Sequence, residues 1–311
     1  MCITCGCSDD ARPTVTDPAT GQTQTIGAHA PHAHDHDHHG DSHEHHHPHH
    51  HDSDSDHERM HDHTHPHRTL LTLEQDVLAK NNRLAERNRG WLEGRNILAL
   101  NLVSSPGAGK TTLLEHTIRD LGQTMRICVV EGDQETLIDA ERIRATGCKT
   151  VQVNTGTGCH LEADMLARAL KTLDPPANSL LMVENVGNLV CPALFDLGER
   201  AKVVILSVTE GADKPLKYPH MFRASSLMIL NKTDLLPHVD FDVATCISHA
   251  RQINPDVDVL ELSAATGEGL DGWYAWLRAR LREGNFATMS EAVGTSLTVA
   301  SLHRPQTLDT Q

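Results

Sequence analysis

A repeating order of short apolar runs and longer amphipathic stretches is the feature that most constrains how this chain can fold. The apolar runs lie at 96–103, 126–131, 150–153, 180–183, 202–208, 227–230 and 257–262. Stretches of good helix formers lie between several of them, at 110–121, 135–145, 161–173, 242–253 and 270–282. Strands that are apolar throughout are buried on both faces, and intervening helices let successive strands run parallel. The sequence therefore predicts an α/β fold with a mostly parallel sheet wrapped by helices.

The chain before residue 70 has a composition that does not suit a core. Residues 27–68 hold 18 of the 24 histidines and nine carboxylates but four apolar side chains, and all nine aromatic residues lie at Trp91 or later. Such a segment cannot bury enough apolar surface to offset the entropy lost on folding. We therefore expect a disordered N-terminal extension, rich in cysteine and histidine, and a folded part that begins near residue 70.

Four zones follow from this pattern. Residues 1–26 carry a cysteine motif and a linker rich in Thr, Pro and Gly, and residues 27–68 form the histidine-rich tract. Residues 70–283 form the folded domain, which opens with an amphipathic helix from about Leu70 to Leu92. Residues 284–311 are polar and lack clear periodicity, so we expect a loose C-terminal tail.

Charge and hydropathy exclude two classes of partner. The 311 residues include 42 acidic and 27 basic side chains, a formal net charge of −15, whereas a general nucleic-acid binder needs a basic surface. No run reaches the roughly 18 apolar residues of a membrane-spanning helix, so no membrane insertion is expected. The first seven residues lack the basic and apolar regions of a secretory signal. We therefore expect a cytoplasmic protein with reduced thiols.

The turn after the first apolar run has the spacing of a phosphate-binding P-loop. It reads Ser-Ser-Pro-Gly-Ala-Gly-Lys-Thr over 104–111. Its glycines allow backbone N–H groups to surround a phosphate at a helix N-terminus, with Lys110 on the β- and γ-phosphates and the Thr111 hydroxyl on Mg²⁺. Ser104 replaces the first glycine of the usual pattern, and an ordinary glycine turn is the alternative. The candidate phosphate-binding residues are Gly107, Ala108, Gly109, Lys110, Thr111 and Thr112.

A second motif selects the base. Asn231-Lys232-Thr233-Asp234 follows the run 227–230. The Asp234 carboxylate can accept hydrogen bonds from N1–H and the exocyclic amine of guanine, whereas adenine would leave it unpaired. The stem of Lys232 can cover the base, and Ser263 and Ala264 lie in a later loop that fits a further guanine contact. The sequence therefore predicts GTP rather than ATP.

Two more loops are candidates for sensing the γ-phosphate. Asp133 ends the second apolar run and is placed to bind Mg²⁺ directly or through water. Glu184-Asn185-Val186-Gly187 ends another run, and the Gly187 amide can meet the γ-phosphate. Two carboxylates at solvent-exposed strand ends are the alternative interpretation. The candidate catalytic residues are Lys110, Asp133, Glu184 and Gly187.

Metal ligands cluster near the N-terminus. Cys2, Cys5 and Cys7 can surround a soft or borderline divalent ion, and a mobile, merely reactive tail is the alternative. The histidines between His29 and His67 suit nickel, zinc and copper with little geometric discrimination. An expression tag is one alternative, although the interleaved Asp, Ser and Glu argue against it, and a pH-responsive solvated tail is another.

A third set of metal-ligand residues lies inside the folded domain. Cys159-His160 opens a helix, and Cys191 lies four residues beyond Gly187. A metal ligand in the loop that reads the γ-phosphate would couple metal binding to the nucleotide state. The alternative is two structural cysteines and a surface histidine. Cys128, Cys148 and Cys246 are assigned to that structural class.

These motifs together resemble the HypB family, the GTPases that deliver nickel during maturation of NiFe hydrogenase. The stretch Glu-Asn-Val-Gly-Asn-Leu-Val-Cys-Pro over 184–192 separates this family from other P-loop proteins. The resemblance implies a SIMIBI-class P-loop NTPase, slow GTP hydrolysis and a homodimer favoured by GTP. It also implies a nickel or zinc site of Cys159, His160 and Cys191 near the dimer interface, and a tight nickel site at Cys2, Cys5 and Cys7. The implied partners are HypA-type and SlyD-type maturation proteins, with the hydrogenase large subunit as client.

Two other functions are kept open. A urease-accessory GTPase of the UreG type also couples GTP to nickel, but it typically carries a Cys-Pro-His motif, and Ala193 follows Cys191-Pro192 here. A nickel storage or detoxification protein with a secondary GTPase domain would account for the histidine tract.

Overall fold

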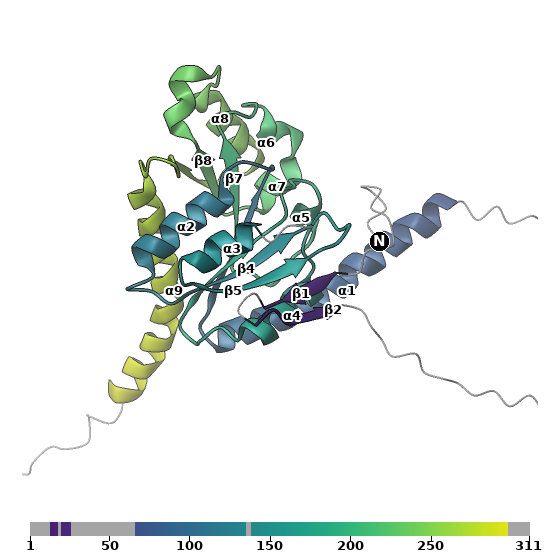
Figure 1. Ribbon diagram of the computed structural model, residues 1–311, viewed down its shortest axis with the longest axis vertical. Helices are drawn as coiled ribbons and strands as arrows, with labels where there is room; N and C mark the ends of the chain where they lie inside the picture. The colour runs from purple at the N-terminus through teal and green to yellow at the C-terminus, as the bar shows by residue number, and fades with distance from the viewer. Residues whose placement is uncertain (1–12, 18–19, 26–65, 135–137, 298–311) are drawn as a thin grey trace, which may run out of the picture.

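The protein folds around a central sheet in a computed structural model that describes residues 13–17, 20–25, 66–134 and 138–297 (Figure 1). The sheet order is β2-β1-β5-β4-β6-β3-β7-β8-β9. The strands are β1 (Thr14–Thr16), β2 (Thr23–Thr25), β3 (Leu98–Ser104), β4 (Ile127–Asp133), β5 (Lys149–Asn154), β6 (Leu180–Glu184), β7 (Ala201–Ser207), β8 (Leu227–Asn231) and β9 (Asp258–Glu261). Strands β3 to β9 pair in parallel, which confirms the predicted α/β fold and its mostly parallel sheet.

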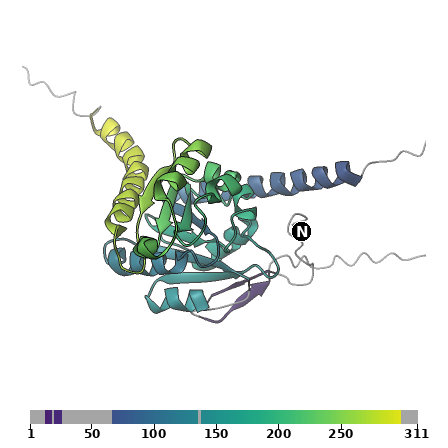
Figure 2. The ribbon, with the colours of Figure 1, turned by 90° about the horizontal axis from the view of Figure 1, so that it is seen from above.

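Helices cover both faces of the sheet (Figures 1 and 2). They are α1 (Pro66–Gly94), α2 (Lys110–Leu121), α3 (Ile138–Ala145), α4 (Ala163–Leu173), α5 (Cys191–Leu194), α6 (Lys214–Lys217), α7 (Pro219–Ala224), α8 (Val243–Ile253) and α9 (Leu270–Leu297), with a 3₁₀ turn at Thr233–His238. The predicted helix 110–121 coincides with α2, and residues 135–137 of the predicted helix 135–145 lie outside the described residues. The short helices α5, α6 and α7 were not predicted, because each is too brief to show periodicity.

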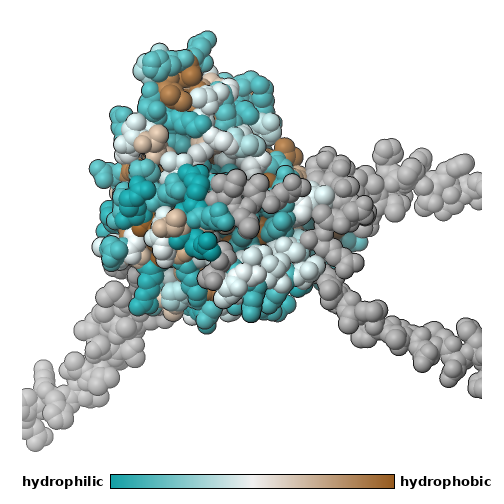
Figure 3. All heavy atoms as spheres, viewed as in Figure 1, coloured by the Kyte–Doolittle hydropathy of each residue, from teal (hydrophilic) through white to brown (hydrophobic). Residues whose placement is uncertain are grey.

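Alternate side chains of β3 point to opposite faces of the sheet, as the pleat of a strand requires. Leu100 and Leu102 pack with α2, α3 and α9. Ala99 packs on the opposite face with α4 and the end of α1, and Val103 packs there with α7 and α8. Every residue of β3, β6, β7 and β8 is buried, which explains why these strands read as continuous apolar runs. Figure 3 shows a mainly hydrophilic outer face with small hydrophobic patches. Among the described helices, none combines the length and apolar character that a membrane span requires.

The expectation that the fold begins near residue 70 was wrong for a short N-terminal hairpin. Strands β1 and β2 pair antiparallel, and β1 extends the sheet by pairing antiparallel with β5. Val15 is buried between β5 and its neighbours, with 2% of its surface exposed. A strand this short carries one apolar side chain inward, so it leaves almost no compositional signal. The predicted metal ligands Cys2, Cys5 and Cys7 and most of the histidine tract lie outside the described residues.

The two outer helices are longer than predicted. Helix α1 begins at Pro66 rather than Leu70, so it includes the last residues of the histidine tract, and its first turns extend beyond the body of the domain (Figures 1 and 2). Helix α9 continues to Leu297, so the prediction of a loose tail from residue 284 was wrong for 284–297. The apolar periodicity used to place both boundaries does not extend over residues 66–69 or 284–297, so neither extension was predicted.

Replacing the inward side chain of the N-terminal hairpin tests its contribution to the core. We expect Val15→Ala to lower the free energy of unfolding by about 2 kcal/mol, because two buried methyl groups are removed. Gln24→Ala on the exposed strand β2 is the matched control and should change it by less than about 0.5 kcal/mol. Urea unfolding of both variants measures the difference, and equal stabilities would show that β1 does not pack on the sheet.

Candidate functional site

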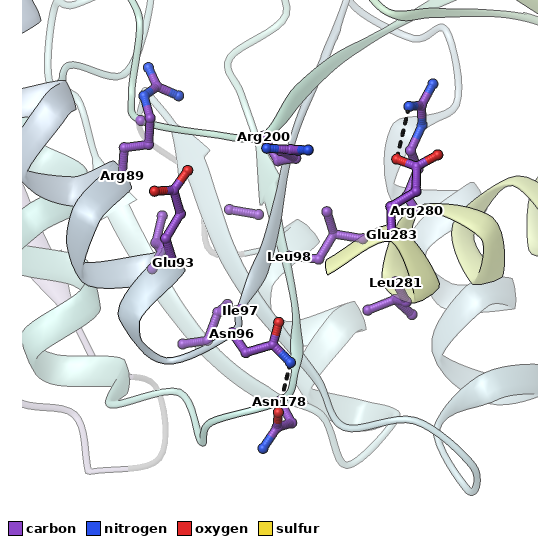
Figure 4. A pocket seen from close by; sticks show the side chains of 13 residues that line it. Arg89, Glu93, Asn96, Ile97, Leu98, Asn178, Arg200, Arg280, Leu281 and Glu283 are labelled. Carbon is purple, nitrogen blue, oxygen red and sulfur yellow. Dashed lines mark hydrogen bonds and ion pairs between the residues drawn. The ribbon is translucent and has the colours of Figure 1, made fainter. Parts of the chain in front are cut away.

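A cavity of about 510 Å³ lies at the carboxyl edge of the parallel strands. The loops after β3, β4 and β6 form most of its wall, because parallel strands end at one edge of the sheet. The lining includes the predicted residues Gly107, Gly109, Lys110, Thr111, Thr112, Asp133, Glu184, Gly187 and Lys232. A second cleft of about 500 Å³ lies near the opposite edge, between the end of α1, the start of β3 and α9, and none of the predicted site residues lines it (Figure 4).

The glycine-rich turn has the backbone of a phosphate-binding loop. Gly107 and Gly109 have φ angles of 72° and 100°, which L side chains rarely adopt, and α2 begins directly after Gly109. Lys110 is buried, and its Nζ donates to Ser104 Oγ at 2.9 Å. Ser104, which replaces the usual glycine, therefore holds the lysine across the mouth of the loop. A helix N-terminus with a lysine so placed attracts phosphate oxygens.

Residues at the end of β8 form hydrogen bonds to the backbone of the phosphate loop. Asn231 Nδ2 donates to the carbonyl of Ala108 at 2.8 Å, and Asn231 Oδ1 accepts from the backbone N–H of Ala264 at 2.9 Å. Lys232 Nζ donates to the carbonyl of Gly107 at 2.7 Å. Ser263 Oγ donates to Asp234 Oδ1 at 2.6 Å. The predicted base-binding residues thus form one hydrogen-bonded group beside the phosphate loop.

Two buried carboxylates lie side by side in the cavity wall. Glu131 of β4 and Glu184 of β6 are register partners, and each has one buried carboxylate oxygen without a hydrogen-bond partner among the described residues. Burial, and then the charge of Glu184, raises the pKa of Glu131 to about 9, and burial raises the pKa of Glu184 to about 7. Thr111 Oγ1 donates to Glu184 Oε1 at 2.9 Å. Unpaired carboxylate oxygens beside a hydroxyl form the oxygen-only donor set that Mg²⁺ prefers.

Glu131 is a site residue that the sequence analysis did not assign. It was predicted as part of a buried strand, and the acidic residue within that strand was the signal for a special role. Asp139 and Arg142 of α3 also line the cavity and were not predicted. Glu184 is buried, so the alternative of a solvent-exposed strand end fails for it, whereas Asp133 is half-buried at the end of β4.

The loop after β6 packs directly on the phosphate loop. A Cβ atom on Gly187 would lie 3.0 Å from three atoms of Pro106, including its backbone nitrogen. Glycine at 187 therefore allows the backbone of residues 186–188 to approach the phosphate loop closely.

Cys159, His160 and Cys191 form a compact group at the end of the loop that follows β6. Cys191 belongs to this loop, and Cys159 and His160 lie between β5 and α4. The two Sγ atoms are 3.1 Å apart, and Cys159 Sγ lies 3.7 Å from His160 Nδ1. One ligand atom from each residue lies within 4.8 Å of the others. Two thiols and an imidazole at this spacing fit a nickel or zinc ion.

Burial holds the histidine of this group in its neutral form. His160 is 4% exposed, and this burial lowers its pKa to about 4. Its Nε2 has no hydrogen-bond partner among the described residues, and its ring lies 4.0 Å from the ring of Phe195, centroid to centroid. A neutral imidazole is the form that binds a metal ion. The alternative of a surface histidine is therefore wrong for His160.

The other three cysteines among the described residues lie elsewhere. Cys128 and Cys246 are buried in separate apolar clusters, and Cys148 is half-buried against the carbonyl of Ile127. None of the three joins the group at 159, 160 and 191.

The fold and the phosphate loop define a P-loop nucleotide-binding protein, and comparisons with known proteins narrow this class. The family described as "CobW/HypB/UreG, nucleotide-binding domain" matches residues 98–261. Hydrogenase maturation factor HypB of Azotobacter vinelandii is 60% identical over 208 residues, which are 67% of this chain and 69% of that protein. The chain belongs to the HypB family of hydrogenase maturation factors, and the resemblance drawn from its motifs is confirmed.

Solved structures support the same assignment. The structure of hydrogenase maturation factor HypB from Archaeoglobus fulgidus is 41% identical with a TM-score of 0.62, covering 65% of this chain and 99% of that chain. The structure of HypB from Helicobacter pylori in complex with nickel is 37% identical with a TM-score of 0.61, covering 66% of this chain and 96% of that chain.

Two glycine substitutions test how closely the two loops pack. We expect Gly187→Ala to lower the free energy of unfolding by about 1–3 kcal/mol, because its methyl group must displace the backbone of Pro106. Gly90→Ala is the control: it lies in helix α1 with no atom within 4 Å of the added carbon, so it should raise stability by roughly 0.5–1 kcal/mol. Thermal and urea unfolding of both variants measure the effects. A neutral result at Gly187 would contradict the close packing.

Proposed function

We propose that this hydrogenase maturation factor is a nickel chaperone that hydrolyses GTP to GDP and phosphate. One observation carries the proposal: a single loop of eight residues, 184–191, supplies Glu184 and Gly187 to the nucleotide cavity and Cys191 to the metal-ligand group. A change in this loop when the γ-phosphate is lost therefore reaches the metal ligands without any long-range route.

The residues around the cavity divide the work of binding and hydrolysis. Backbone N–H groups of residues 107–112 and Lys110 bind the phosphates, and Asp234 with Lys232, Ser263 and Ala264 binds guanine. Thr111, Glu184 and Asp133 would hold Mg²⁺, which neutralises charge on the β- and γ-phosphates when bound. The Gly187 amide faces the γ-phosphate and reports its presence to the rest of the loop.

The metal-ligand group is proposed to hold nickel as cargo. Cys159, His160 and Cys191 supply soft sulfur ligands and a neutral imidazole, which suit nickel and, equally, zinc. The HypB structure from Helicobacter pylori was solved with nickel, which supports the same cargo here. Cys2, Cys5 and Cys7 are proposed as a second, tighter nickel site, and the histidine tract as a nickel store.

Assembly and location are proposed on the same basis. A homodimer favoured by GTP is supported by Val190 and Leu194, two exposed apolar side chains on either side of Cys191, with half of each surface in solvent. HypA-type and SlyD-type maturation proteins are the proposed partners, and the hydrogenase large subunit is the client in the cytoplasm. The division into 1–26, 27–68, 70–283 and 284–311 stands as a proposal, modified by the N-terminal hairpin and the longer helix α9.

Nickel titration in two nucleotide states tests the proposed coupling. The full-length chain carrying serine at 2, 5 and 7 retains Cys159 and Cys191 for nickel–thiolate absorption, to which the histidines do not contribute. We expect the nickel affinity to differ between the GDP form and the form with a non-hydrolysable GTP analogue by on the order of tenfold. Cys159→Ala should abolish the signal, and Cys246→Ala, a buried cysteine in another cluster, should leave it intact.

Equal nickel affinities in the two states would refute the coupling. In that case storage by the histidine tract becomes the main function, and deletion of residues 27–65 should raise sensitivity to nickel while leaving hydrogenase active in nickel-replete cells.

A single substitution tests the choice of base. We expect Asp234→Asn to weaken GTP binding by about 100-fold or more, because the amide presents a donor to a guanine donor and loses a charged hydrogen bond. Isothermal titration with GTP and ATP measures this, with Asp240→Asn as a control in the following loop. GTP affinity that survives Asp234→Asn would show that this carboxylate does not read the base.

A further inference from the structure

We infer that Asn185, locked in place by Asn101 and the buried ion pair Glu199–Lys202, is the positioning residue that transmits the nucleotide state to the metal ligands. This inference rests on the proposed function and names the side chains through which its two sites are coupled. Asn185 lines the nucleotide cavity, but none of the four residues is assigned as a ligand of the phosphates or of the metal ion.

The carboxamide of Asn185 joins the two loops directly. Its Oδ1 accepts from the backbone N–H of Leu161 at 3.1 Å, and Leu161 follows the metal-ligand residue His160. Its own backbone follows Glu184 and donates from N–H to the carbonyl of Leu102 at 3.0 Å. Asn185 is 1% exposed, so these bonds are shielded from bulk solvent. A movement at the end of β6 therefore displaces the backbone beside His160.

A second side chain fixes the orientation of this carboxamide. Asn185 Nδ2 donates to Asn101 Oδ1 at 3.2 Å, and Asn101 Nδ2 donates onward to Glu199 Oε1 at 3.1 Å. Because a carboxylate accepts and does not donate, it forces the oxygen of Asn101 toward Asn185. That in turn leaves Asn185 Oδ1 facing Leu161.

The ion pair behind Asn101 reaches the metal-ligand group by another route. Lys202 Nζ lies 3.2 Å from Glu199 Oε1 and donates to the carbonyl of Phe195 at 3.2 Å. The ring of Phe195 packs on the ring of His160. Two chains of contacts therefore connect the network to the metal-ligand group. One runs through Asn185 to Leu161, beside His160, and the other runs through Lys202 to Phe195.

The burial and location of the Glu199–Lys202 ion pair indicate that it positions neighbouring groups rather than adding to the stability of the fold. Both side chains are less than one-tenth exposed, and a buried ion pair often contributes less to stability than apolar residues of similar size. A polar network in which the bonding groups are paired instead fixes one arrangement of the groups that it holds. The network bonds to the backbone of Leu161, beside His160, and to Phe195, which packs on the His160 ring, so the arrangement that it fixes includes these surroundings of the metal-ligand group.

The test replaces the pair by apolar side chains in the full-length chain with serine at 2, 5 and 7. In Glu199→Leu/Lys202→Met no buried charge is left unpaired, but Asn101 loses its acceptor and Phe195 loses the lysine donor. The nickel–thiolate signal is titrated with Ni²⁺ in the GDP form and with a non-hydrolysable GTP analogue. We expect nickel binding to persist, while the ratio of the two affinities falls from on the order of tenfold to less than about twofold.

Two further variants keep the result interpretable. Thr117→Val removes a buried hydrogen bond from Trp273 Nε1 in a separate part of the core, so it controls for general loss of stability and should keep the wild-type ratio. Asn101→Ala breaks the same network without removing a charge, and it should lower the ratio of the two nickel affinities as the double variant is expected to. It provides the test if the double variant fails to fold.

The outcomes separate this inference from the proposed function. A wild-type protein without any difference between nucleotide states refutes the proposed function, and this inference with it. A wild-type difference that survives in a folded network variant refutes this inference alone. Nickel should also change the ratio of the affinities for the GTP analogue and for GDP by the same factor in each variant, because coupling between two sites is reciprocal.

Discussion

The parallel pairing of β3 with β6 and β7 sets the position of every group discussed above. The register joins Leu102 to Glu184, so the chain leaves β3 into the phosphate loop beside the place where β6 ends in its carboxylate. The next pairing joins Glu131 of β4 to Glu184. Two carboxylates are thereby held together inside the protein, where burial raises the pKa of both. A cation bound between them would relieve the cost of holding two carboxylates together, which the register of the sheet imposes.

The same strand order gathers the candidate metal ligands. Strand β5 lies one strand beyond β4, and the loop that follows it carries Cys159 and His160. The loop after β6 carries Cys191 back over the edge of the sheet to meet them. Because that loop also contacts the phosphate loop through Gly187, the nucleotide cavity and the metal-ligand group share one short piece of backbone. Coupling between them requires movement of a few residues rather than of a domain.

Polar side chains inside the core connect these two sites, and they are costly to place there unless they are paired. Asn101, Asn185, Glu199 and Lys202 satisfy one another in a region where the surrounding strands are apolar. The N-terminal helix reinforces this region from outside: Asn88 Nδ2 donates to the carbonyls of Ala163 and Leu197. A network of this kind holds loops in defined positions, which suits a protein proposed to pass a metal ion on when its nucleotide changes.

The amino-acid sequence by itself determined the class of fold, the phosphate loop, the base motif and the family, because each depends on local patterns. Continuous apolar runs identify strands buried on both faces, and glycines at 107 and 109 identify a turn with φ angles that other residues rarely adopt. The tertiary structure alone decided that Glu131 lies against Glu184 and that Val15 joins the sheet, whereas the grouping of Cys191 with Cys159 and His160 was implied by the family resemblance and is seen in the structure. These facts depend on strand order and register, which are set by the summed packing of distant residues and leave no periodic signal along the chain.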